Sequence, residues 1–258
     1  MSPEDGEMVC SQIIETENRL IIIDVQLLRP YAAQLRRYVD GLDKPIDRVI
    51  VTHSHPDHWF GLEYFEDVPL YALPEVIAEI EQLGDSYLDY KRSQHGPDLI
   101  AAHKVVPSNV LQEGEAMIDG VRFAFTKIIG AESSVMAVTE LPDLKVLLPQ
   151  DLVYNRVYLY VGEKSPTGTY CFDAWLHWLE QSRERDYDVV LPGHGEPTDA
   201  TIFDRAITYL RDARQAFEQA PGPDELKQMM IDRYPTYRVA ELLDLTNVFL
   251  YNLFQAAK

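Results

Sequence analysis

The feature that most constrains this chain is a run of metal-type side chains directly after an apolar segment. Residues 46–52 are typical of a buried strand, and residues 53–58 continue as His-Ser-His-Pro-Asp-His. Three of the seven histidines fall within these six positions, so chance explains the run poorly. Imidazole nitrogens and carboxylate oxygens are ligands that suit zinc and its neighbours. Because α/β proteins place chemistry in loops at strand ends, the segment predicts a metal site at the end of a buried strand.

Three further segments place a ligand-type side chain within or after an apolar run. Residues 20–24 end in Asp24, residues 148–151 end in Asp151, and residues 189–195 contain His194. Together with the run at residues 53–58, and in this order, they strongly resemble the metallo-β-lactamase superfamily of hydrolases. The family's usual glycine before the later aspartate is Gln150 in this chain.

The resemblance implies a four-layer αββα sandwich, in which two mixed β-sheets pack face to face with helices outside. Residues 1–258 would form a single such domain, with C-terminal helices over about residues 198–258. The pattern of the sequence alone supports only an α/β or α+β fold.

The hydrophobic pattern and the turn residues give the following expected elements. Strands are expected at 8–14, 19–25, 46–52, 70–72, 104–106, 115–118, 121–128, 135–139, 145–148 and 188–191. Helices are expected at 31–41, 74–83, 169–184, from 198 or 199 to 218, 224–234 and 239–257. Residues 84–102 are weakly periodic and are expected to form an insertion, a mobile loop or an ordinary connection.

The resemblance divides the candidate metal ligands into two sites. The first site would use His53 and His55. The second would take its ligands from the end of the run and from the two later segments, namely Asp57, His58, Asp151 and His194.

The family's third histidine is missing from this chain. The corresponding residues 129–134 read Ile-Gly-Ala-Glu-Ser-Ser, in which Glu132 is the one side chain able to bind a metal. Two imidazoles and one carboxylate are an accepted ligand set for zinc and for ferrous iron. Glu132 therefore either replaces the histidine at the first site, or is a solvated loop residue beside a weak or empty site. The sequence leaves both open.

Zinc, as one or two ions, is the expected cofactor, with iron and manganese as alternatives. A metal held in this way makes hydroxide available near neutral pH, so the expected reaction is attack of metal-bound hydroxide on a carbonyl. Asp151 would bridge two ions, and Asp57 would also pass a proton to the leaving group. Asp24 would accept an N–H from a ligand histidine, or would form a turn at the strand end.

Tyr154 stands three residues after Asp151, a spacing that resembles the metal-dependent acyl-homoserine lactonases. The resemblance implies that this tyrosine helps to hold the substrate carbonyl, and a phenol could donate to a developing oxyanion. A packing aromatic is the alternative. The function expected first is hydrolysis of a lactone or lactam, then of a thioester. Iron-dependent redox chemistry on the same fold, or a degenerate metal-binding protein with little turnover, are the alternatives.

The composition of the chain limits the kinds of partner and the cellular location that can be expected. The net charge of −19 opposes binding to nucleic acid, so a small-molecule substrate is expected. Two cysteines give no disulfide framework. No apolar run has the length of a membrane span and no signal peptide is visible, so a cytoplasmic location is expected. The sequence does not determine the oligomeric state.

Overall fold

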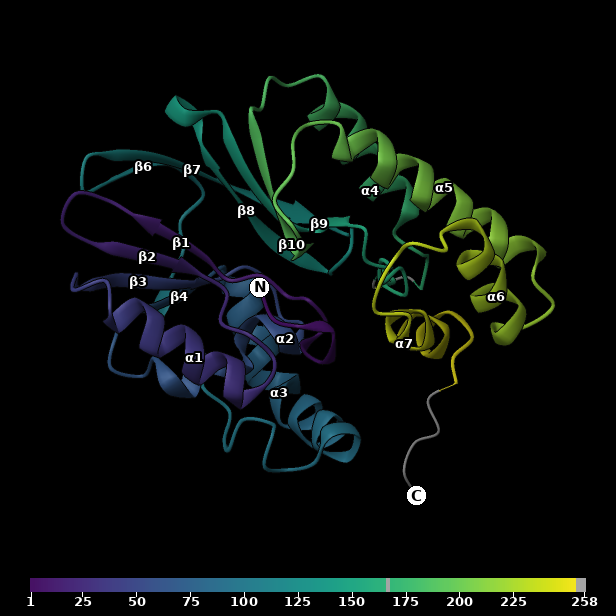
Figure 1. The fold of residues 1–258 in the computed structure, drawn as a ribbon, viewed down its shortest axis with the longest axis horizontal. Coiled ribbons are helices and arrows are strands. Elements are labelled where there is room, and N and C mark those ends of the chain that lie inside the picture. The colour runs from purple at the N-terminus through teal and green to yellow at the C-terminus, as the bar shows by residue number, and fades with distance from the viewer. Residues whose placement is uncertain (166–167, 254–258) are drawn as a thin grey trace.

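The computed structural model describes residues 1–165 and 168–253, and its core is a pair of five-stranded sheets packed face to face (Figure 1). The first sheet has the order β1 (Gln12–Glu15), β2 (Leu20–Ile23), β3 (Ile46–Val51), β4 (Leu70–Ala72) and β5 (Asn109–Val110). The second has the order β10 (Val189–Gly195), β9 (Val146–Asn155), β8 (Val135–Leu141), β7 (Val121–Ile129) and β6 (Gly114–Ile118). Each sheet contains parallel and antiparallel pairs.

Helices cover the outer faces of both sheets (Figure 1). On the first sheet lie α1 (Arg29–Asp40), the short α2 (Pro56–Trp59) and α3 (Pro74–His95). On the second lie α4 (Phe172–Arg183) and α5 (Ile202–Gln219), followed by α6 (Pro223–Arg233) and α7 (Glu241–Leu250). Short 3₁₀ turns occupy Glu4–Gly6, Phe60–Tyr64 and Pro142–Leu144. The predicted αββα sandwich is confirmed, whereas the single-domain boundary 1–258 stays a prediction.

β2 and the second half of β3 are buried on both faces, which explains their unbroken apolar sequence. All four residues of β2 are fully buried, and so is the second half of β3. The two strands pair Ile23 with Ile50, so the residues that follow them emerge at the same edge. Asp24 therefore lies beside Thr52, and the His-rich run begins one residue later.

The region predicted as a loop at residues 84–102 is mostly helix, so that prediction was wrong. α3 continues through Gly84 to His95. A Cβ at Gly84 would lie 2.5 Å from Lys104 Cδ and 3.1 Å from the ring of Trp59. Gly84 therefore lets Lys104 and Trp59 pack closely against α3, and the helix continues through this position.

Other boundaries also differ from the sequence-based expectation. Residues 104–106 are not a strand, and the short strand β5 follows instead. β9 does not stop before Asp151 but runs on to Asn155, with Gln150 at a positive φ of 49°. α7 ends at Leu250, and residues 254–258 of the helix expected there lie outside the described residues. Within the described ranges, no helix is long and apolar enough to cross a bilayer.

Candidate metal centre

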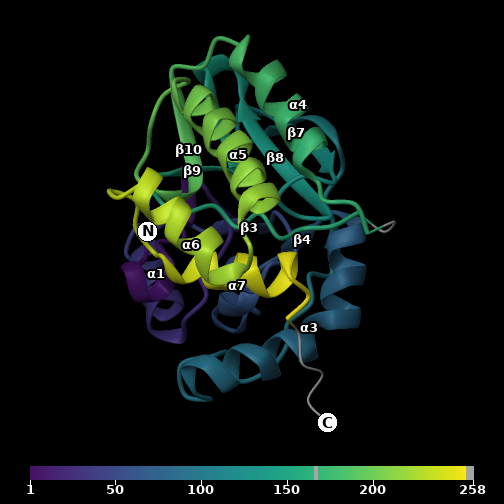
Figure 2. The same cartoon turned by 90° about the vertical axis from the view of Figure 1, so that its right-hand side faces the viewer.

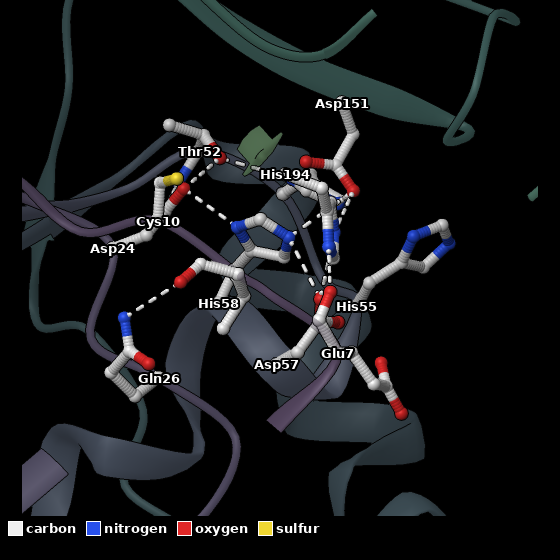
Figure 3. A network of polar contacts seen from close by, with 12 residues as sticks. Glu7, Cys10, Asp24, Gln26, Thr52, His55, Asp57, His58, Asp151 and His194 are labelled. Carbon is white, nitrogen blue, oxygen red and sulfur yellow. Dashed lines mark hydrogen bonds and ion pairs between the residues drawn. The ribbon is translucent and has the colours of Figure 1, made fainter. Parts of the chain in front are cut away.

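Seven histidine and carboxylate side chains from separate elements converge at one end of the two sheets (Figure 3 labels five of them). His53 and His55 follow β3, whereas Asp57 and His58 lie on α2. The other three come from the second sheet: Glu132 from the β7–β8 turn, Asp151 from β9 and His194 from β10. All are buried except His55, whose side chain keeps 20% of its surface exposed.

The first group gathers around Glu132. His55 Nδ1 lies 3.2 Å from Glu132 Oε1, and His53 Nε2 lies 3.6 Å from Glu132 Oε2. His53 Nε2 also lies 3.8 Å from Asp151 Oδ2. Glu132 is fully buried, so it is not the solvated loop residue of the alternative interpretation. That it replaces the missing histidine as a ligand stays a proposal.

The second group gathers around two aspartates. His58 Nε2 lies 3.2 Å from Asp57 Oδ2 and 3.2 Å from Asp151 Oδ2. His194 Nε2 lies 3.2 Å from Asp57 Oδ2 and 3.1 Å from Asp151 Oδ2. Asp151 belongs to both groups, the position that a carboxylate bridging two ions requires.

These distances fit divalent cations. A tetrahedral zinc ion with ligands at about 2.0–2.2 Å holds neighbouring ligand atoms about 3.3–3.6 Å apart. Buried polar atoms normally have hydrogen-bond partners. In the described part of the chain, four buried atoms of the cluster have none, namely His53 Nε2, His58 Nε2, Glu132 Oε2 and Asp151 Oδ1. Cations bound between them would satisfy all four, so the residues fit a binuclear site.

Hydrogen bonds behind the cluster orient two of its imidazoles. His58 Nδ1 lies 2.8 Å from Asp24 Oδ2, which can only accept, so His58 carries its proton on Nδ1. Thr52 Oγ1 donates to the same Asp24 oxygen and therefore accepts from His53 Nδ1, 3.0 Å away. The Nε2 atoms of both rings consequently face the centre, where each would bind a cation in its unprotonated form. Asp24 thus makes the contact that the sequence predicts for it.

The amino-terminal segment orients the last imidazole. His194 Nδ1 donates to the backbone carbonyl of Glu7 over 2.7 Å, which again leaves Nε2 free to face the cluster (Figure 3). The backbone of Cys10 donates to the carbonyl of Gly193, and Gly195 donates to the carbonyl of Met8. Residues 7–10 therefore hold the His194 loop, a role that the sequence did not reveal.

The electrostatics of the cluster are dominated by burial and by mutual attraction. Burial raises the pKa of Asp151, but His58 and His194 outweigh burial and hold that pKa well below its usual value. Burial raises the pKa of Glu132 above its usual value. Asp151 therefore stays ionised beside the histidines, whereas burial favours the neutral form of Glu132 unless a cation lies close by.

Tyr154 lies within the cluster, as its spacing from Asp151 predicts. Its hydroxyl donates to Asp151 Oδ2 over 2.8 Å and lies 3.2 Å from Glu132 Oε1. Its ring stacks on His194 with the centroids 4.3 Å apart. By contrast, His103 lies on the surface, paired with Glu66 and outside the cluster.

The cluster forms the floor of a cavity of about 200 Å³, the site cavity. Its walls are mainly apolar and come from α3, from the segment after β9 and from α7: Tyr87, Tyr90, Tyr160, Leu242, Leu245 and Phe249. Glu7, Lys91 and Glu163 add charged groups. Figure 2 shows α7 on the same side of the molecule as α5 and α6, above the end of α3.

An edge-to-face series of rings joins the floor of the site cavity to α7. The ring of Tyr160 contacts His55 at 5.4 Å between centroids and Phe249 at 5.6 Å. Thr246 Oγ1 on α7 accepts from the backbone N–H of Val161, and Tyr170 donates to the carbonyl of Leu250. α7 is thus a docked wall of the cavity, although it is far from the ligands in sequence.

Two mixed sheets with a buried histidine and carboxylate cluster at one end define the class of metal-binding hydrolases with the αββα fold. Residues 7–194 match the metallo-beta-lactamase superfamily, so the chain belongs to this family, and the resemblance seen in the sequence is confirmed. α5, α6 and α7 lie beyond the matched residues.

Solved structures support the fold. A metallo-beta-lactamase from Pontibacter korlensis is 18% identical, with a TM-score of 0.62 over 79% of this chain and 87% of its own. The DIM-1 metallo-beta-lactamase, solved after exposure to ceftazidime, is 17% identical, with a TM-score of 0.61 over 80% of this chain and 85% of its own. At this level of identity the likeness concerns the fold alone.

Two curated relatives are alkylsulfatases by name. The chain is 25% identical to the alkyl/aryl-sulfatase BDS1 of Saccharomyces cerevisiae, over 90% of this chain and 41% of the relative. It is 24% identical to a linear primary-alkylsulfatase of a Pseudomonas species, over 83% of this chain and 48% of the relative. The chain therefore spans less than half the length of these two relatives.

Proposed function

We propose that this chain is a metal-dependent hydrolase of small esters with an apolar body, and that alkyl sulfates are the first substrate class to test. The observation that carries the proposal is the buried cluster, with its four unpartnered polar atoms, at the floor of a mostly apolar cavity. The names of the two relatives support a sulfate ester. Zinc is proposed first, with iron and manganese as alternatives, because this ligand set suits all three.

The residues would divide the work as follows. His53, His55 and Glu132 would hold one ion, and Asp57, His58 and His194 the other, with Asp151 between them. Divalent cations bound there would lower the pKa of water and draw electron density from the ester. Water would then supply the oxygen that ends on sulfur, while the alcohol leaves with a proton.

Two side chains would handle protons in this reaction. Asp57 lines the site cavity, and its carboxylate is positioned to carry a proton from the attacking water toward the leaving alcohol. Tyr154 also lines the cavity, and its hydroxyl would donate to an oxygen that gains charge after turning from Asp151 Oδ2. Tyr154 is the observation that keeps lactone hydrolysis as the second candidate, since a phenol serves a carbonyl oxygen equally well.

The test is a comparison of substrates with matched apolar parts. Protein stripped with a chelator and reloaded with zinc, manganese or iron would be assayed on octyl sulfate and on a lactone with an alkyl side chain of similar length. We expect hydrolysis of octyl sulfate that is lost on chelation and restored by metal. Hydrolysis of the lactone alone would favour the second candidate, and hydrolysis of neither by metal-loaded protein would refute both.

A matched pair of variants links turnover to the cluster. Asp151→Asn removes the shared charge, whereas Asp186→Asn changes a surface aspartate that pairs with Lys145. Only Asp151→Asn should lower both metal content and turnover. Equal losses in the two variants would indicate that turnover does not depend on the cluster.

A further inference from the structure

Lys91 is a buried cation beside the metal cluster that the fold itself does not explain. It lies on α3, in the part of the chain that the sequence predicts as a loop, and its side chain is only 6% exposed. Its Nζ lies 2.7 Å from Glu7 Oε1. Lys91 lines the site cavity together with Asp57, Asp151 and His194.

A buried ion pair is weak support for stability, because desolvation of both charges offsets their attraction. Burial lowers the pKa of Lys91, but Glu7 outweighs burial and raises that pKa above its usual value, so the side chain stays a cation. An ammonium has three N–H donors. Among the described residues Glu7 is its hydrogen-bond acceptor, which leaves donor capacity for a ligand in the cavity.

The position of Lys91 is fixed relative to the second ligand group. The backbone carbonyl of Glu7 holds His194, and the carboxylate of the same residue holds Lys91. Of the described residues that line the site cavity, Lys91 is the only lysine or arginine. A substrate oxygen that carries negative charge and does not reach the metal ligands therefore has one fixed cation to bind.

The two candidate substrate classes differ in this respect. A sulfate monoester carries a negative charge spread over three terminal oxygens, whereas a lactone is neutral and offers one carbonyl oxygen. Charge-assisted hydrogen bonds are about twice as strong as neutral ones, so a buried ammonium favours the charged ester.

We infer that Lys91 binds a terminal oxygen of an anionic ester and selects this substrate class over neutral esters. The inference rests on the proposed hydrolase function of the same cavity. It places the charged head beside Glu7 and His194, and the apolar body against α3 and α7.

The experiment compares Lys91→Met with Lys145→Met, a control on the surface between β8 and β9. For octyl sulfate, kcat/KM should fall about 10- to 100-fold in Lys91→Met, the usual effect of losing a charged hydrogen bond. For the neutral lactone it should change less than about threefold. The double variant Lys91→Met/Glu7→Gln leaves no unpaired buried charge behind. If it shows the same selective loss on octyl sulfate as Lys91→Met, then the loss reflects recognition of the substrate and not misfolding. Equal losses on both substrates, or no loss on either, would overturn the inference.

Binding of inorganic sulfate provides a readout that does not depend on turnover. Calorimetric titration of the metal-loaded protein should give a Kd that is weaker by about tenfold or more in Lys91→Met. An unchanged Kd would overturn the role of Lys91, even if octyl sulfate is hydrolysed. Sulfate binding that depends on Lys91, without hydrolysis of any ester, would instead refute the proposed function and leave only anion binding by Lys91.

Discussion

The close approach of β10 to β9 leads to the prediction that Gly193→Ala abolishes metal binding. A Cβ on Gly193 would lie 1.8 Å from Asp151 Oδ1 and 2.9 Å from the carbonyl carbon of Gln150. The carboxylate oxygen would have to retreat to the 3.4 Å at which ordinary contact begins. Metal–ligand distances tolerate changes of only about 0.2 Å. Because Asp151 belongs to both ligand groups, its displacement should cost both ions.

The magnitude of the effect has two parts. Overpacking of a rigid core costs about 1–3 kcal/mol, and for a chain of this length Tm falls by about 2–4 °C per kcal/mol. Loss of the ions should lower Tm further. Added zinc should therefore raise Tm in the wild type but not in Gly193→Ala.

The assay is metal content by mass spectrometry after dialysis, together with Tm measured with and without zinc. Gly41→Ala is the control, because Gly41 has helical angles and its nearest neighbour would be the Tyr38 carbonyl oxygen at 3.3 Å. If Gly193→Ala keeps the wild-type metal content and turnover, then the approach of β10 does not position Asp151, and the reasoning is refuted.

Three further predictions follow from the cluster, the cavity wall and one surface turn. Chelation should lower Tm, because an ion present at 1,000 times its Kd stabilises the fold by about 4.1 kcal/mol; an unchanged Tm would contradict metal binding. Phe249→Ala should raise KM for octyl sulfate more than for ethyl sulfate, since the ring lies on the apolar wall; equal effects on both would show that the wall does not contact the alkyl chain. Hydrogen bonds from Thr16 and Asn18 lower the pKa of Asp119 to about 2. This carboxylate therefore stabilises the fold above about pH 4, and the effect is lost as pH falls toward 2. The Tm difference between wild type and Asp119→Asn should be larger at pH 7 than at pH 3, and a difference independent of pH would contradict this.

Much of the ligand set could be predicted because the ligand residues lie in short, recognisable segments of the sequence. His53 to His58 form a local run, and only the order of later segments was needed to add Asp151 and His194. Glu132 could be proposed because its stretch offers no other ligand, yet its burial depends on the packing of the β7–β8 turn and could not be read from sequence.

The cavity wall could not be predicted, since its physical causes are tertiary. A glycine normally weakens a helix, but at Gly84 the close packing of Trp59 and Lys104 leaves no room for a larger residue. The loop prediction for residues 84–102 followed from their weak periodicity and hid Lys91, whose burial no local pattern indicates. The first expectation for the substrate, a lactone or lactam, relied on the family resemblance and on the spacing of Tyr154, and neither describes this wall.

The separation of α7 from the ligand-bearing segments has an evolutionary consequence. Residues 7–194 match the family, whereas the apolar side chains of α7 begin at Leu242. Substitutions in α7 can therefore accumulate without changing any candidate metal ligand. The substrate range of one inherited reaction can change through substitutions in this one helix near the end of the sequence.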